Sequence, residues 1–159
     1  MYNSISASTE KFQEYLKTKA INRNVTLIAE ELSKEAISRQ KATDSVARVV
    51  ASSLDSTNHQ FCDPDSETRE SMGISDRQIK KKHGLPETGG LSHQELEIYD
   101  KAKTECDRIK EKHWFSLIKD HVCLNVIFIC GDTHVESFKK LVIKEGYPAE
   151  VLSTNWKIE

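Results

Sequence analysis

The chain has 159 residues, a formal charge of -2 and a pI near 6.3, which suits one domain with a real core and gives no global attraction for nucleic acid or anionic membranes. No apolar stretch approaches the roughly 20 residues of a membrane span, and the N-terminus lacks the basic and then apolar order of a signal peptide. The four cysteines form no C-x-x-C pair, which favours buried, reduced thiols in a cytoplasmic protein.

Short apolar runs alternate with helical patterns along the first half of the chain. Apolar residues at helical spacing predict helices at about 9–19, 32–38, 44–56 and 66–72. The run 25–29 reads V-T-L-I-A and predicts a strand, because β-branched residues favour extended backbone.

Acidic residues follow the predicted strands. Glu30 and Glu31 come directly after the first strand, and strand alternation lets at most one of the two carboxylates enter a given cleft. Both acids would equally suit the first turn of a following helix. A second short strand is expected at 59–62, and it ends on Asp63 because Pro64 prevents an inner strand from continuing.

The middle of the chain is the most polar part. Residues 76–92 contain three consecutive lysines, a proline and a glycine pair, which predicts an exposed loop that is mobile or acts as a lid. A highly charged helical pattern resumes at 91–117 and fits one amphipathic helix or two helices with a break.

An unbroken apolar run at 126–130 indicates a strand that is buried on both faces, as in a parallel sheet covered by helices. Asp132 and Thr133 then supply N-cap chemistry for a helix that extends to about 145. His134 therefore lies where a strand turns into a helix. Ligands of open α/β sheets bind at such strand ends, so these three side chains are candidates for substrate binding and chemistry.

A last strand is expected at 150–153. The alternation of strands and helices predicts a single α/β domain over 1–159, with a mainly parallel sheet and helices on both faces. The strands at either edge of this sheet, around Val151 or near His59, offer a route to a homo-oligomer.

The strand-end residues support two chemistries. His134 and Glu30 could hold a divalent metal ion such as Mn, Co or Zn, which would lower the pKa of a bound water. Alternatively, His134 is a general base oriented by Glu30 or Glu31, with Asp63 as a supporting acid and no metal. Arg69 could bind an anionic group of a substrate, although a surface ion pair is the commoner role of such an arginine.

Several common catalytic motifs are absent from the sequence. The histidines show no H-E-x-x-H spacing, and the chain has neither a phosphate-binding G-x-x-x-x-G-K-[ST] loop nor a G-x-S-x-G nucleophile elbow. Phosphate-loop NTPases and serine hydrolases of that type are therefore not indicated.

Four segments together carry a family resemblance: I-A-E-E at 28–31, C-D-P-D at 62–65, a Trp-bearing helix at 110–118 and F-I-C-G-D-T-H-V-E-S-F at 128–138. In combination they resemble the Tiki/TraB-like superfamily, which also includes ChaN-like and erythromycin-esterase-like proteins. The resemblance implies a hydrolase in which Gly131 and His134 form the second GxxH motif of the family and Glu30 or Glu31 is its acid.

The chain departs from the family pattern at two places. It has no first GxxH motif before Phe12, and Lys110 stands four residues before Trp114, where the helix arginine of the family is expected. Three functions follow as alternatives: a hydrolase of an amide, ester or phosphoester of a small molecule or peptide, a non-catalytic ligand-sensing or protein-interaction domain that keeps the cleft, and a nucleotide-binding domain.

Overall fold

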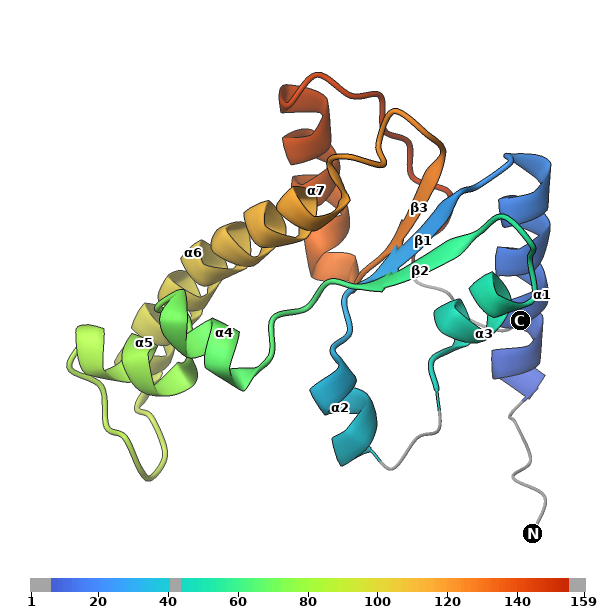
Figure 1. The fold of residues 1–159 in the computed structure, drawn as a ribbon. Helices are drawn as coiled ribbons and strands as arrows, with labels where there is room; N and C mark the ends of the chain where they lie inside the picture. Colours follow the sequence, from blue (N-terminus) through green and yellow to red (C-terminus); the bar gives the residue numbers. More distant parts are fainter. Residues whose placement is uncertain (1–6, 41–43, 155–159) are drawn as a thin grey trace, which may run out of the picture.

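The computed structural model describes residues 7–40 and 44–154 and contains one small parallel sheet (Figure 1). Its strands are β1 (Leu27–Glu30), β2 (Asn58–Phe61) and β3 (Val126–Ile129), in the order β2-β1-β3. Both outer strands run parallel to β1, and Leu27 pairs with Asn58 on one side and with Val126 on the other. The α/β class with a parallel sheet is therefore confirmed.

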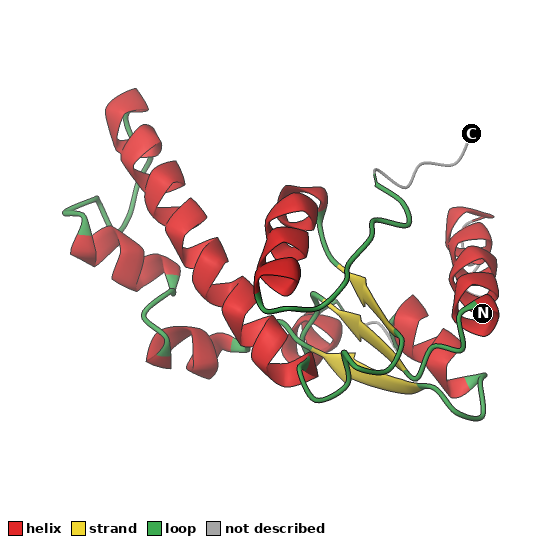
Figure 2. Ribbon diagram, turned by 90° about the horizontal axis from the view of Figure 1, so that it is seen from above, coloured by secondary structure: helices red, strands yellow, loops and turns green. Residues whose placement is uncertain are grey.

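Helices cover both faces of the sheet (Figures 1 and 2). One layer is formed by α1 (Ala7–Asn22) and α3 (Val46–Ser52), and the other by the C-terminal part of α6 (His93–Ile118) together with α7 (Asp132–Lys144). Because successive strand residues point to opposite faces, the core is divided into two clusters, one on each face of the sheet. Ile28 and Ile127 pack with the α1 layer, whereas Leu27 and Phe128 pack with the α6 layer.

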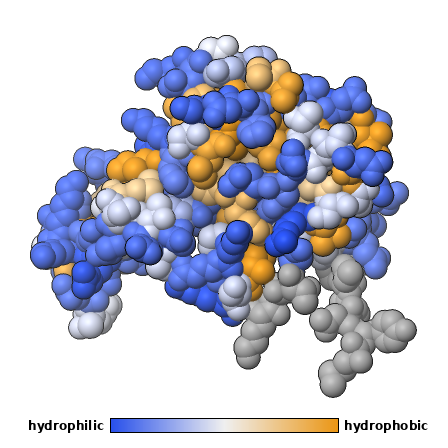
Figure 3. Space-filling model, in the orientation of Figure 1, coloured by the Kyte–Doolittle hydropathy of each residue, from blue (hydrophilic) through white to orange (hydrophobic). Residues whose placement is uncertain are grey.

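The polar middle of the chain forms a helical arm that extends from the sheet. It contains α4 (Ser66–Ser71), α5 (Asp76–Lys82) and the N-terminal part of α6, and Figure 3 shows it as largely hydrophilic. The prediction of a loop over 76–92 is wrong for its first part. Ser75 and Gln78 form a capping box that starts α5, and Ile79 buries the one apolar face that this short helix has.

The long charged stretch is one helix rather than two. Ser92 and Glu95 form a second capping box at the start of α6, which then continues unbroken to Ile118. The remaining short helix, α2 (Lys34–Arg39), is capped by Ser33 and follows β1 after a brief turn. None of the described helices is both long and apolar enough to cross a membrane.

The expected last strand at 150–153 does not form. The chain leaves α7 and runs back along the β3 side of the sheet, but residues 150–153 make no strand pairing with β3 (Figures 1 and 2). Side-chain packing holds this segment instead, since Leu152 packs against the α1 layer and Ala149 against the α7 layer. An apolar β-branched pattern predicted the extended course, but it could not predict whether a partner strand lies within hydrogen-bonding reach.

Candidate functional site

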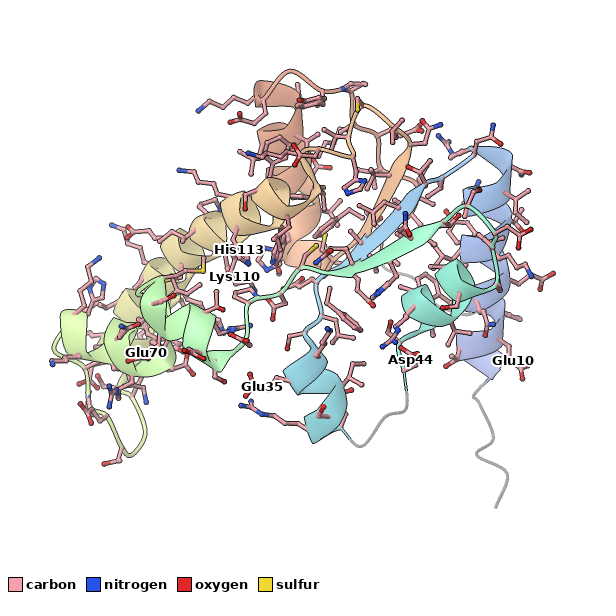
Figure 4. All side chains as sticks on the ribbon, viewed as in Figure 1. Glu10, Glu35, Asp44, Glu70, Lys110 and His113 are labelled. Carbon is pink, nitrogen blue, oxygen red and sulfur yellow. The ribbon has the colours of Figure 1, made fainter. Side chains whose placement is uncertain are left out.

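Polar groups from all three strand ends meet at the carboxyl edge of the sheet. Glu31 follows β1, Asp63 comes shortly after β2, and Gly131 begins the turn from β3 into α7. Helix α6 passes this edge, and its Lys110 and His113 lie beside the strand ends (Figure 4). The parallel sheet thus collects residues that are far apart in sequence, as expected for an open α/β fold.

Glu30, the last residue of β1, and Glu31, which follows it, point to opposite layers, as strand alternation requires. Glu30 accepts a hydrogen bond from the Ser45 hydroxyl and pairs with His59 at 2.6 Å, on the α3 side of the sheet. Glu31 lies on the α6 side, where it accepts from the Gly131 N–H at 2.9 Å. The structure therefore brings Glu31, and not Glu30, to the start of α7.

His134 is buried in the first turn of α7, with 5% of its surface exposed. Its Nδ1 lies 3.0 Å from Oε1 of Glu111 on α6, and its ring meets the Trp114 ring edge-on at 5.0 Å between centroids. Its Nε2 faces two other carboxylates, with Oε1 of Glu31 at 3.5 Å and Oδ1 of Asp107 at 3.9 Å. Glu111 therefore holds Nδ1, whereas Nε2 faces two carboxylates at longer distances.

Glu111 is the central residue that sequence reasoning missed, and only 1% of it is exposed. Besides His134, its carboxylate accepts hydrogen bonds from the Ser137 hydroxyl at 2.6 Å and from Arg108 Nη1 at 2.7 and 2.5 Å. A signal was present in the sequence. Glu111 occupies the same helical stripe as Trp114 and Ile118, and an acid on a buried stripe requires specific partners.

Lys110 places a positive charge among the remaining acids. Its Nζ lies 2.9 Å from Glu31 Oε1, 3.7 Å from Asp63 Oδ1 and 3.9 Å from Asp107 Oδ1. The ammonium also stands over the Trp114 ring, 5.1 Å from the centroid. The side chain is largely buried, so these charge interactions are screened less by solvent than those of a surface lysine.

Asp63 and Arg69 form an ion pair at the rim of the cluster. Arg69 Nη2 lies 2.5 Å from Asp63 Oδ2, and its Nε donates to the Pro64 carbonyl at 2.9 Å. Arg69 is 37% exposed in its side chain, so the structure supports the ion-pair role. The second oxygen of Asp63 is buried without a hydrogen-bond donor and faces the Lys110 ammonium.

The other predicted binding residues lie outside the buried cluster. Asp132 and Thr133 are both exposed at the start of α7. Asp132 lines a separate cavity on the β3 side of the sheet, described below. Gly131 caps the helix without a side-chain hydrogen bond.

The described residues contain no set of three histidine, cysteine or acidic side chains arranged to hold a metal ion. The Lys110 ammonium lies among Glu31, Asp63 and Asp107, where its charge already compensates these carboxylates. The expected pair of metal ligands is also divided, because Glu30 bonds to Ser45 and His59 in a different cluster from His134. These donors do not fit a metal ion in the arrangement seen.

Two cysteines border the strand ends, and both have a raised pKa. Burial raises the pKa of Cys130 from 9.0 to about 12, helped by the negative charges of Glu31 and Glu111. Burial also raises the pKa of Cys62 to about 12. Both thiols are therefore protonated at neutral pH and poorly reactive.

Comparison with protein families, curated proteins and solved structures gives no match to this chain. The resemblance to the Tiki/TraB-like superfamily therefore stays a prediction from the sequence motifs.

Proposed function

We propose that the protein is a hydrolase in which His134 acts as general base and Glu111 orients it. The observation that carries this proposal is the contact of 3.0 Å between His134 Nδ1 and Glu111 Oε1. An ionised carboxylate only accepts hydrogen bonds, and Glu111 already accepts from Arg108 and Ser137. Nδ1 therefore carries the proton, which leaves the Nε2 lone pair available to a water molecule.

The neighbouring charges suit the attack of water on a carbonyl carbon. As the water adds, its proton passes to His134 Nε2 and negative charge develops on the carbonyl oxygen. The Lys110 ammonium is held by Glu31 in a poorly solvated position, where it can stabilise that oxyanion. His134 then returns the proton to the departing alcohol or amine, so that a carboxylic acid and the free leaving group result.

The balance of charges favours a neutral substrate over a phosphoester. Four carboxylates gather at the site: Glu31, Asp63, Asp107 and Glu111. Three fixed cations face them: Lys110, Arg69 and Arg108. Each cation already pairs with an acid, so a dianionic phosphate would meet no surplus of positive charge. We therefore assign the substrate to the esters or amides.

Hydrolysis of p-nitrophenyl butyrate, compared with that of p-nitrophenyl phosphate, tests the proposal. We expect saturable cleavage of the butyrate alone and a loss of about a hundredfold in kcat/KM in His134→Asn. His93→Asn is the matched control, because this histidine lies on the same helix as Glu111 but at its far end, with 89% of its side chain exposed. It should keep the wild-type rate.

Three results would contradict the proposal. Equal rates in His134→Asn and the wild type would show that the hydrolysis does not use this histidine, provided both proteins have the same circular dichroism spectrum. Preferential cleavage of the phosphate would refute the assignment of substrate. Loss of activity in the presence of a chelator, with recovery on addition of Mn²⁺, Co²⁺ or Zn²⁺, would refute the metal-free mechanism and support the metal-assisted one.

A further inference from the structure

A cavity of about 590 Å³ lies along the edge of β3 that faces away from β1. All residues from 126 to 130 line one wall, and all residues from 148 to 153 line the opposite wall. Side chains of α1 and α7 close the two remaining sides, and most of them are apolar. The cavity is thus a slot between a strand edge and a second extended stretch of chain.

Successive residues of the outer wall, 148–153, face opposite layers of the protein, as the residues of a strand do. Glu150 and Leu152 face the α1 layer, since Glu150 pairs with Arg23 and the Tyr15 hydroxyl donates to the Leu152 carbonyl at 3.0 Å. Ala149 packs into the opposite layer. These contacts hold the segment on the far side of the slot. Among the described residues, no backbone hydrogen bond joins it to β3.

The inner wall presents backbone groups of β3 to the slot. The carbonyls of Asn125 and Ile129 accept from the N–H groups of residues 26 and 31, so alternate residues of this strand are used by β1. The N–H and C=O groups of one residue point to the same side of a strand. Those of Val126, Phe128 and Cys130 therefore point into the slot.

We propose that this slot binds an extended peptide segment of a partner protein, which joins the sheet beside β3 as an added strand. A peptide supplies N–H and C=O groups at the spacing of the strand edge, whereas a hydrocarbon ligand would leave the groups of β3 without partners. Its side chains would alternate into the two apolar layers that also receive Ala149 and Leu152. The volume falls within the range of ordinary binding cavities.

Charge indicates which peptides would bind best. Three cations line the slot: Lys19, Arg23 and Lys139. Two acids line it: Asp132 and Glu150. Since Arg23 and Glu150 pair with each other, the surplus is positive, and an acidic residue in the peptide is favoured. This surface is separate from the His134 cluster, so the inference stands whether or not the protein is a hydrolase.

The test uses a capped heptapeptide of alternating threonine and valine that ends in aspartate. Binding to the full chain is followed by NMR spectroscopy of the backbone amides. We expect saturable shifts at Val126, Phe128 and Cys130. Two further peptides carry N-methyl groups on two valines or on two threonines. One of the two should bind about tenfold more weakly than the unmodified peptide, because only alternate residues of an added strand donate hydrogen bonds to β3.

Two arginine substitutions provide the protein control. Val151→Arg places a long charged side chain in the slot and should remove binding, whereas Ile143→Arg, at a residue 50% exposed on α7, should leave it unchanged. Absence of saturable shifts in the wild type would overturn the proposal. Binding of both N-methylated peptides as tightly as the unmodified one would show an apolar cavity without strand addition. Amides at Val126 and Phe128 that resist hydrogen exchange before peptide is added would show that residues 148–153 themselves pair with β3.

Discussion

Among the described residues, two histidine–glutamate pairs lie largely out of solvent on opposite faces of the sheet, and they differ in what surrounds them. His59 Nε2 lies 2.6 Å from Glu30 Oε1, and the Ser45 hydroxyl donates to the same oxygen. Ser45 also caps α3 by accepting from the Arg48 N–H. This pair therefore connects β1, β2 and α3, and its bonds are used to hold the fold.

The second pair has the same two residue types but lies among further charged side chains. Glu111 holds Nδ1 of His134, while Nε2 lies beyond ordinary hydrogen-bond distance from the carboxylates of Glu31 and Asp107. A lysine ammonium lies in the same cluster. The two pairs thus differ in the charged side chains around them, and the proposed assignment of the general base to His134 depends on this difference.

Removal of the Glu111 carboxylate should have the largest effect on the fold. Glu111→Ala leaves Arg108, Ser137 and His134 without their shared acceptor, so we expect the free energy of unfolding to fall by about 3 kcal/mol. Urea denaturation measures this loss. Glu136→Ala, at an exposed position of α7, is the control and should change stability by less than about 0.5 kcal/mol. Equal effects of the two substitutions would contradict the buried network.

Exchange of each histidine for asparagine separates the two pairs by function. His134→Asn should lower ester hydrolysis about a hundredfold, whereas His59→Asn should lower the free energy of unfolding by about 1–2 kcal/mol and leave kcat/KM within twofold. Enzyme assays and urea titrations of both variants give the comparison. A larger loss of activity in His59→Asn than in His134→Asn would reverse the assignment.

Loss of the lysine ammonium should destabilise the protein. Lys110→Met leaves the carboxylates of Glu31, Asp63 and Asp107 facing each other, and we expect the free energy of unfolding to fall by about 1–2 kcal/mol at neutral pH. Urea denaturation of the wild type and the variant measures this loss. An unchanged stability of Lys110→Met would contradict the compensation of these carboxylates by the lysine.

The smallest expected effect on stability concerns Cys62, the buried cysteine that follows β2. The pKa of Cys62 is raised from 9.0 to about 12 in the folded protein, so the unfolded chain ionises this thiol first. Its contribution to stability is therefore complete below pH 9 and is lost as the pH rises towards about 12. Unfolding of wild type and Cys62→Ala at about pH 8 and pH 10 measures the difference, which should narrow at the higher pH. A constant difference would contradict the raised pKa.

Local sequence patterns predicted the three strands of the sheet, although the fourth expected strand, at 150–153, does not form. The run 25–29 predicted β1 within two residues at its start, and the run 126–130 predicted β3 together with the helix that follows it. Strand alternation also separated Glu30 from Glu31 in advance. These features depend on neighbouring residues, which periodicity describes well.

The site itself depends on contacts that no local pattern contains. Lys110 and Glu31 are 79 residues apart, and Glu111 meets His134 only because α6 crosses the strand ends at one particular turn. The helix α5 was missed for a related reason. Its lysine-rich sequence is typical of a loop. The signals of a helix are the capping box of Ser75 and Gln78 and the single buried apolar residue, Ile79.

The position of the proton on His134 tests the central claim most directly. Nitrogen-15 NMR spectroscopy of the histidine rings at neutral pH distinguishes a proton on Nδ1 from a proton on Nε2. A general base held by Glu111 must show a protonated Nδ1 and a bare Nε2, and Glu111→Gln should disturb this preference. A proton on Nε2 in the wild type, alone or together with one on Nδ1, would mean that His134 cannot accept a proton from water, and it would contradict the account.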